Sequence, residues 1–167
     1  MEAINVTGKK IRRLTVGGML AALVAVFTAY VSVPIAGGYF HPGAAMIALS
    51  SAVLGPYAAI PAAIGSGLAD LLAGYTIYAP FTFVIKGLVG FIAGYGCRSG
   101  KLEMRSVGML VLAGVVIPAG YFVTDCILYG LATAIASVAW NCLQGVVCIA
   151  AGCACLGTRI GKIAGCK

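Results

Sequence analysis

The chain has 167 residues, of which 62% are apolar and only 9% are charged. Ordinary soluble domains are roughly 45–50% apolar and about 25% charged, so this composition excludes a disordered chain and argues against a soluble enzyme or a nucleic-acid-binding module. A transmembrane helix needs ~20 apolar residues, and six such helices with short loops fill a chain of this length. The composition therefore predicts one small polytopic membrane domain.

The net charge of +7 comes from basic residues that gather at three places in the chain. They precede the first apolar run, lie in the middle of the chain and close it: Lys9, Lys10, Arg12, Arg13, Arg98, Lys101, Arg105, Arg159, Lys162 and Lys167. Under the positive-inside rule, such clusters beside membrane spans mark cytoplasmic segments. The charge therefore indicates a membrane topology, and we expect no nucleic-acid partner.

Apolar runs cover residues 14–34, 43–55, 57–73, 80–97, 106–129 and 135–157. The second and third are short and can be interpreted as one long helix or as two spans. One helix would place the basic clusters on opposite sides of the membrane, whereas two spans place all of them in the cytoplasm. Pro56 and Pro61 also disfavour an unbroken helix. We therefore expect an all-α integral membrane protein, a six-transmembrane-helix bundle with both termini cytoplasmic.

The whole chain, 1–167, is predicted to be a single membrane domain. It divides into a basic cytoplasmic N-terminal segment at 1–13, the six-helix bundle at 14–157 and a basic cytoplasmic tail at 158–167. The sequence has one histidine, and its seven cysteines lie mostly in apolar runs without zinc-site spacing. We interpret the cysteines as packing residues and expect no metal site.

The sequence lacks the motifs of an enzyme or of an ATPase. It has no Gly-x-Ser-x-Gly elbow, and the stretch from Gly157 to Lys162 lacks the spacing of a phosphate-binding loop. We therefore expect no catalytic activity and no cofactor. If the protein drives uptake, the energy must come from a partner or from an ion gradient.

Ionisable residues inside membrane spans are costly and mark candidate functional sites. The predicted spans contain three of them, Asp70, Lys86 and Asp125, together with the amides Asn141 and Gln144. At 1.5 Å per residue, all five lie in the outer half of the predicted bundle. Polar groups confined to this depth indicate a pocket that opens outward, because a pore needs them at every depth.

Helical spacing brings aromatic and polar side chains onto shared faces of the last three predicted spans, which is typical of a small-ligand site. The candidate substrate-binding residues are Lys86, Asp125, Asn141, Gln144, Tyr121, Trp140, Thr82 and His41. Some of them have structural alternatives. The lysine either contacts ligand or forms an ion pair with Asp70 or Asp125, and the two amides either bind ligand or join helices. The histidine either covers the substrate or is a surface residue.

The charge count within the predicted spans suggests the chemistry of the ligand. Asp70 and Asp125 oppose the single charge of Lys86, so one carboxylate lacks an intrinsic partner if both are ionised. A ligand with a basic ring nitrogen would supply that partner. We therefore expect a small aromatic heterocycle, with Asp70 forming a structural ion pair with Lys86.

Small residues recur every four positions in the first apolar run, at Ala21, Ala25 and Ala29. Such a stripe allows helices to approach closely. It serves either as a docking surface for a partner's helices or as internal packing. Gly90 and Gly94 form a similar notch in the fourth run, for which we expect internal packing.

Several motifs together resemble one family of membrane proteins. They are Leu54-Gly55-Pro56-Tyr57, the run from Gly65 to Tyr75, Tyr78-Ala79-Pro80-Phe81-Thr82, Ile85-Lys86-Gly87, Gly120-Tyr121-Phe122, Tyr129-Gly130 and Asn141-Cys142-Leu143-Gln144. The chain resembles the S components, the substrate-binding subunits of energy-coupling factor vitamin transporters. It is similar to the riboflavin-type group, in particular to its pyridoxine-like and hydroxymethylpyrimidine branch. The alanine stripe resembles the family's Ala-x-x-x-Ala docking motif, and Asp125 stands where related sequences carry Glu.

The resemblance implies a multi-pass protein of the bacterial cell membrane that binds a vitamin with high affinity. Its partners would be one transmembrane T component and two ATPase subunits. Pyridoxine, pyridoxal and hydroxymethylpyrimidine are the favoured substrates, and riboflavin and thiamine are further candidates. The alternative function is an autonomous ion-coupled carrier of small molecules, in which Asp70 or Asp125 is the coupling carboxylate.

Overall fold

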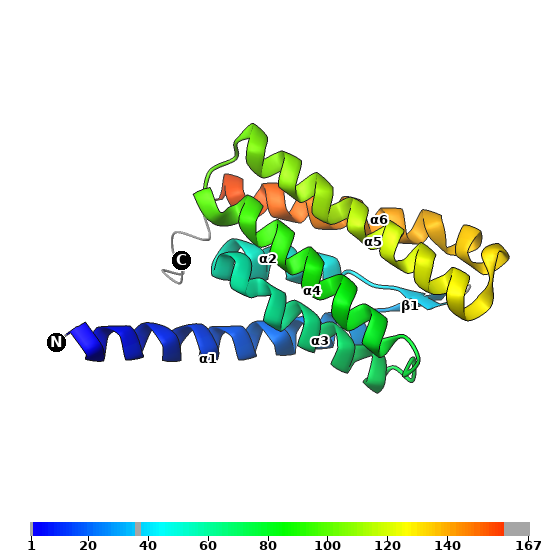
Figure 1. The fold of residues 1–167 in the computed structure, drawn as a ribbon, viewed down its shortest axis with the longest axis horizontal. Coiled ribbons are helices and arrows are strands. Elements are labelled where there is room, and N and C mark those ends of the chain that lie inside the picture. Colours follow the sequence, from blue (N-terminus) through cyan, green and yellow to red (C-terminus); the bar gives the residue numbers. More distant parts are fainter. Residues whose placement is uncertain (1, 36–37, 159–167) are drawn as a thin grey trace.

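The computed structural model describes residues 2–35 and 38–158, and within them the chain forms six α-helices, two short 3₁₀ helices and one β-hairpin (Figure 1). The α-helices are α1 (Glu2–Ala29), α2 (Gly43–Leu54), α3 (Ala59–Leu72), α4 (Ala79–Gly96), α5 (Met104–Tyr129) and α6 (Leu131–Gly157). The remaining elements are β1 (Val33–Ile35), β2 (Gly38–Phe40), η1 (Gly55–Ala58) and η2 (Cys97–Ser99).

This is an all-α membrane protein with five candidate transmembrane segments among the described residues. They are Lys10–Ala29, Gly43–Leu72, Ala79–Ser99, Met104–Tyr129 and Leu131–Gly157. The second segment contains α2, η1 and α3, because α2 and α3 have only 12 and 14 residues and neither is long enough by itself. We predicted six spans, whereas the described residues contain five segments of spanning length, because the second and third predicted spans fall within one of them.

The chain reverses direction at η1, so α2 and α3 form the two arms of a hairpin (Figure 1). Gly55 begins the turn with φ +60°, a left-handed conformation that glycine adopts without strain. Pro56 follows and lacks the N–H that a continued helix needs. The sequence-based argument against one unbroken helix is thus confirmed for this stretch.

Helix α4 packs tightly against this turn. A Cβ at Gly90 would lie 2.8 Å from the carbonyl oxygen of Ala58, and a Cβ at Gly94 would contact the carbonyl oxygen of Gly55 even more closely. Only glycine allows this approach of helix to turn. The predicted role of Gly90 and Gly94 in internal packing is confirmed.

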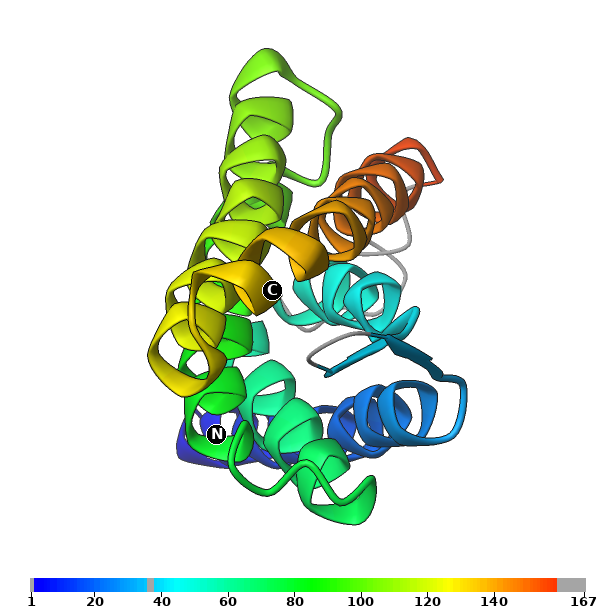
Figure 2. The ribbon, with the colours of Figure 1, turned by 90° about the vertical axis from the view of Figure 1, so that its right-hand side faces the viewer.

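The helices close into a ring in which α1 contacts α3, α3 contacts α4, α4 contacts α5, α5 contacts α6, α6 contacts α2 and α2 returns to α1. Helix α2 also contacts α4 across the ring and is buried along most of its length. Figure 2 shows the β-hairpin beside α1 and α2 at one end of the bundle. The contact between α2 and α4 divides the ring, with α5 and α6 on one side and α1 and α3 on the other.

Helix α1 differs from its predicted bounds at both ends. It begins at Glu2, so the described part of the basic segment 1–13 is helical, and it ends at Ala29 instead of residue 34. The strand β1 (Val33–Ile35) follows, where the prediction continued the helix. The residue before a proline is disfavoured in a helix, and Pro34 and the β-branched residues around it favour an extended chain.

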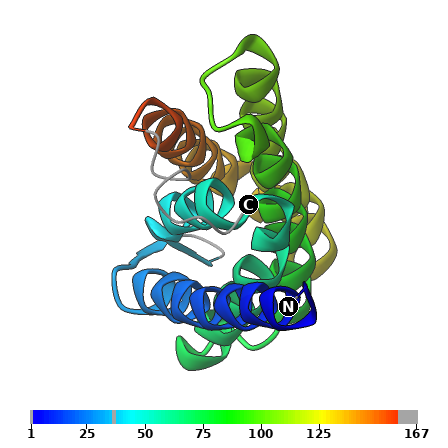
Figure 3. The same ribbon diagram turned by 90° about the vertical axis from the view of Figure 1, so that its left-hand side faces the viewer.

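The start of α1 and the end of α6 lie at the same end of the bundle, which Figure 3 shows from the side of the N-terminus. Arg13 and Arg98 line a common hollow there. Lys101 lies in the connection between α4 and α5, and Arg105 lies in the first turn of α5. The basic end is thus opposite the hairpin end. Most of the predicted cytoplasmic tail, residues 159–167, lies outside the described residues.

Candidate substrate-binding site

A network of buried polar side chains lies in the half of the bundle nearer the β-hairpin, between α4, α5 and α6. Helical spacing positions its members, because residues four apart share a helix face. On α4 the buried face carries Tyr78 at its N-cap, then Thr82 and Lys86, each one turn further on. Each of these three side chains is hydrogen-bonded to α5 or α6.

The first part of the network surrounds Asp125, which is 2% exposed. The Tyr78 hydroxyl donates a 2.6 Å hydrogen bond to Asp125 Oδ1. The Ser137 hydroxyl donates one of 2.5 Å to Oδ2, and Asn141 Nδ2 donates to Ser137 Oγ at 3.4 Å. Burial raises the pKa of Tyr78, and its hydrogen bond to Asp125 raises it further. The phenol therefore stays protonated and remains a donor at physiological pH.

The second part of the network surrounds Lys86, which is fully buried. Lys86 Nζ donates a 2.9 Å hydrogen bond to Gln144 Oε1 and lies 5.2 Å from the centroid of the Tyr121 ring. The Tyr121 hydroxyl is 3.1 Å from Thr82 Oγ1. A cation, an amide and an aromatic face therefore meet at the interface of α4, α5 and α6.

The structure answers part of the question about alternative roles. Asp70 on α3 is 3% exposed and attracts Lys86 electrostatically, and the predicted ion pair between them stays a prediction. Asp125 accepts its hydrogen bonds from the hydroxyl groups of Tyr78, the N-cap residue of α4, and Ser137 of α6. Gln144 does join two helices, as its alternative role required. The hydrogen bond of Asn141 stays within α6.

His41 lies between β2 and α2 and is 4% exposed, so it is not the surface residue that one alternative described. The backbone N–H of Gly43 donates to its Nδ1 at 3.2 Å. Burial lowers the pKa of His41 well below its usual range, and the positive charge of Lys86 lowers it further. The imidazole is therefore neutral at physiological pH and lies within electrostatic reach of the lysine.

Trp140 and the middle of the alanine stripe do not lie where the sequence predicted them. Trp140 is 42% exposed, which places its side chain on the outer face of α6. In the alanine stripe, Ala25 is 5% exposed and packs within the chain itself, whereas Ala21 and Ala29 are partly exposed. The middle of the stripe therefore contributes to internal packing.

Sequence comparison assigns the chain to a family. The family model described as "ECF-type riboflavin transporter, S component" matches residues 8–160. This chain is an S component of the energy-coupling factor (ECF) type. As a member of this family it is a multi-pass transport protein of prokaryotic cell membranes and not an enzyme.

Two relatives are similar over most of their length. One, described as "Uncharacterized protein in gap 3'region" of Pyrococcus woesei, is 33% identical over 127 residues, which cover 75% of this chain and 85% of that protein. The other is the "Thiamine precursor transporter HmpT" of Lactococcus lactis subsp. cremoris (strain MG1363). It is 32% identical over 149 residues, which cover 83% of this chain and 82% of that protein.

The network of this S component includes two residues that the sequence-based prediction left out of the site, Tyr78 and Ser137. Both obey the spacing that identified the other members. Tyr78 lies one turn before Thr82, and Ser137 lies one turn before Asn141. Among the described residues, no group of three or more His, Cys, Asp and Glu side chains is placed to hold a metal ion.

Proposed function

We propose that this S component binds a small nitrogen heterocycle of the pyridoxine or hydroxymethylpyrimidine type between α4, α5 and α6. Asp125, Asn141, Lys86, Gln144 and Tyr121 are the contacting residues. Thr82 positions Tyr121, Asp70 supports the lysine from α3, and His41 closes the site from the β2–α2 connection.

The observation that carries this proposal is the environment of Asp125. The two hydrogen bonds that its carboxylate accepts both come from neutral hydroxyl groups, those of Tyr78 and Ser137. These bonds hold the carboxylate in one orientation without neutralising its charge. A ligand with a protonated ring nitrogen supplies the missing charge, and a charge-assisted hydrogen bond is about twice as strong as a neutral one. Pyridine and aminopyrimidine rings both offer such a nitrogen.

The part of the network around Lys86 complements the other edge of such a ligand. Lys86 Nζ and the Gln144 amide offer donors and an acceptor for hydroxyl and exocyclic amino groups. The Tyr121 ring, which already faces the ammonium group, offers a surface for stacking. The carboxylate of Asp125, the ammonium group of Lys86 and the ring of Tyr121 together complement a polar aromatic ring.

The relatives support the choice of substrate class. HmpT is named a thiamine precursor transporter, and hydroxymethylpyrimidine, the pyrimidine precursor of thiamine, combines a basic ring nitrogen, an amino group and a hydroxymethyl group. The matching family model is named for riboflavin, a larger heterocycle. We rank hydroxymethylpyrimidine and pyridoxine first because one carboxylate and one ammonium group suit a small ring.

In this proposal the protein binds its ligand with high affinity and works as part of an ATP-driven importer. A transmembrane T component and two ATPase subunits would provide the energy, since the chain has no phosphate-binding loop. The bundle would cross the membrane six times, with both termini cytoplasmic, because this arrangement places every basic cluster on one side. The alanine stripe on α1 would face the T component through its partly exposed residues.

The test is equilibrium binding of pyridoxine, pyridoxal, hydroxymethylpyrimidine, thiamine and riboflavin to the purified protein. Asp125→Asn and Gln144→Ala should weaken binding of the best ligand more than tenfold, because losing a charged hydrogen bond in a buried site typically costs ~2–5 kcal/mol. Glu103→Gln and Cys142→Ala make similar changes at exposed positions and should stay within threefold of wild type. If both site variants fold and also stay within threefold, the site assignment is wrong.

A further inference from the structure

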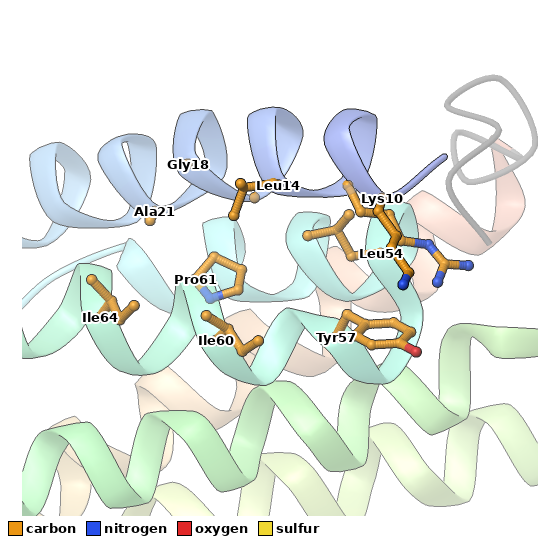
Figure 4. A pocket seen from close by; sticks show the side chains of 11 residues that line it. Lys10, Leu14, Gly18, Ala21, Leu54, Tyr57, Ile60, Pro61 and Ile64 are labelled. Carbon is orange, nitrogen blue, oxygen red and sulfur yellow. The ribbon is translucent and has the colours of Figure 1, made fainter. Parts of the chain in front are cut away.

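Helix α1 has a surface face and a buried face. Ala21 lies on the surface face, which borders a groove that Ile64 of α3 lines from the other side (Figure 4). The buried face carries Leu20, Val24 and Thr28, which recur every four residues. The proposed docking of the T component uses the surface face, so the buried face of α1 is available to the inside of the bundle.

The hydroxyl groups of Thr28 and Ser66 are fully buried and have no hydrogen-bond partner among the described residues. A hydroxyl group within a helix commonly donates to the carbonyl oxygen one turn before it. Ser50 and Thr124, which are also buried, do so at 2.8 and 2.9 Å. Because an unpaired buried hydroxyl group is costly, Thr28 and Ser66 are candidates for contact with a ligand.

Thr28 lies beside His41, the residue that connects β2 to α2. The space that a Cβ of Gly43 would fill is bordered by Thr28 Oγ1 and by His41 Nδ1, the latter at 2.8 Å. Only glycine leaves room for these two side chains to meet there. The charge of Lys86 acts on His41, so the Thr28 hydroxyl group adjoins the part of the polar network around the lysine.

Ser66 approaches the same part of the network from α3. It lies one turn before Asp70, so the two side chains share a face of the helix. The charge of Asp70 acts on both Lys86 and Tyr121. The face of α3 that carries Ser66 is therefore turned toward the polar network.

The two hydroxyl groups lie at similar depths in the bundle. Helices α1 and α3 run in the same direction (Figure 1), and Val24 Cβ lies 2.8 Å from the position of a Cβ at Gly65. Thr28 is one turn beyond Val24, and Ser66 is next to Gly65, so the two residues differ in height by ~5 Å. One small ring with two substituents spans such a separation.

From these observations we infer that Thr28 and Ser66 form a second arm of the binding site, which binds hydroxymethyl groups of the ligand. The inference rests on the proposed function and deepens it. Asp125 binds the ring nitrogen, and the hydroxyl arm on α1 and α3 selects among the rings that carry one. A hydroxyl group both donates and accepts, which matches an alcohol. The carboxylate of Asp70 repels a phosphate ester. Two such hydroxyl groups match the two hydroxymethyl groups of pyridoxine better than the single one of hydroxymethylpyrimidine.

Titration calorimetry of the purified full chain tests the hydroxyl arm with three compounds. They are pyridoxine, its analogue with methyl groups in place of both hydroxymethyl groups, and hydroxymethylpyrimidine. The wild type should bind pyridoxine most tightly. Thr28→Val and Ser66→Ala should each weaken binding of pyridoxine about fivefold or more and binding of the methyl analogue less than twofold. The matched controls Thr124→Val and Ser50→Ala remove hydroxyl groups that bond to their own helix and should leave both affinities unchanged.

The melting temperature of the ligand-free protein separates ligand contact from a structural role. Thr28→Val and Ser66→Ala remove unpaired hydroxyl groups, so the melting temperature should stay the same or rise. A lower melting temperature, an equal loss for pyridoxine and its methyl analogue, or tighter binding of hydroxymethylpyrimidine would overturn the inference. If Asp125→Asn weakens binding of all three compounds in that case, the proposed function stands without the hydroxyl arm. If the wild type binds none of them, both are wrong.

Discussion

Lys86 Nζ donates a 2.9 Å hydrogen bond to Gln144 Oε1 and thereby joins α4 to α6 in the buried centre of the bundle. An ammonium group without water around it is costly, and the structure surrounds this one with an amide oxygen, the attraction of Asp70 and the face of Tyr121. Such an arrangement either holds the helices together or is prepared for a ligand. The two roles predict different outcomes for the same substitutions.

Lys86→Met should lower both stability and ligand affinity, because it leaves the Gln144 amide buried without its partner, at a cost of ~1–3 kcal/mol. The double variant Lys86→Met/Gln144→Met removes both polar groups and should recover most of the stability. It should still bind ligand more than tenfold more weakly than wild type. Thermal unfolding and equilibrium binding measured on the same samples separate the two effects. Recovery of binding in the double variant would show that the pair is only structural.

Tyr78 and Ser137, whose hydroxyl groups donate hydrogen bonds to Asp125, should act as positioning residues. Tyr78→Phe removes the 2.6 Å bond to Oδ1, and a hydrogen bond to a charged group contributes ~1.5–3 kcal/mol. We expect an affinity loss of about tenfold or more for a ligand with a basic ring nitrogen, measured by titration calorimetry. Tyr95→Phe makes the same change at a 40% exposed position of α4 and should leave the affinity unchanged. Equal affinities of the two variants would remove Tyr78 from the site.

His41 should make the stability of the protein depend on pH. Its folded-state pKa is lowered by burial and by Lys86, so the unfolded chain takes up a proton below pH ~6.5 more readily than the folded chain. The stabilisation is therefore complete above that pH and is lost as the pH falls below it. The melting temperature should drop between pH 7.5 and 5, and the drop should be smaller in His41→Asn, which keeps an acceptor for the Gly43 N–H. An identical drop in both proteins would contradict this assignment.

The number of spans can be decided by labelling cysteines in intact cells. With six spans, Thr76 lies outside and Ser99 lies in the cytoplasm. If Gly43–Leu72 crossed as a single span, the two sites would exchange sides. Both residues are exposed, so a membrane-impermeant thiol reagent should modify Thr76→Cys and not Ser99→Cys. The unsubstituted protein provides the background of its own seven cysteines, and labelling of Ser99→Cys alone would refute the six-span topology.

The sequence was sufficient for the features that depend on local pattern. Apolar runs with basic flanks predict membrane spans without any knowledge of how the helices pack. Likewise, Thr82 and Lys86 share a face in any helix, because they are four residues apart. The bonds between helices were not predictable in the same way. Ser137 contacts Asp125 only because α5 and α6 cross at one particular register. Its spacing from Asn141 predicts a shared face of α6 and not this contact.

The position of Trp140 shows the same limit. It is adjacent to Asn141 in the sequence, but successive residues of a helix point about 100° apart, so the amide is buried and the indole is 42% exposed. The β-hairpin was missed for a different reason. Its strands have three residues each, too few for an alternating pattern to be recognised beside a membrane span.

Analysis of the small molecule that co-purifies with the protein tests the central claim most directly. Wild type and Asp125→Asn would be purified in parallel from cells supplied with pyridoxine and hydroxymethylpyrimidine, and the bound compound identified and quantified by mass spectrometry. We predict that the wild type carries a pyridine or pyrimidine compound in near-stoichiometric amount and that folded Asp125→Asn carries at least tenfold less. A wild-type protein that retains no nitrogen heterocycle, or a variant that retains as much as the wild type, would contradict the proposed function of this site.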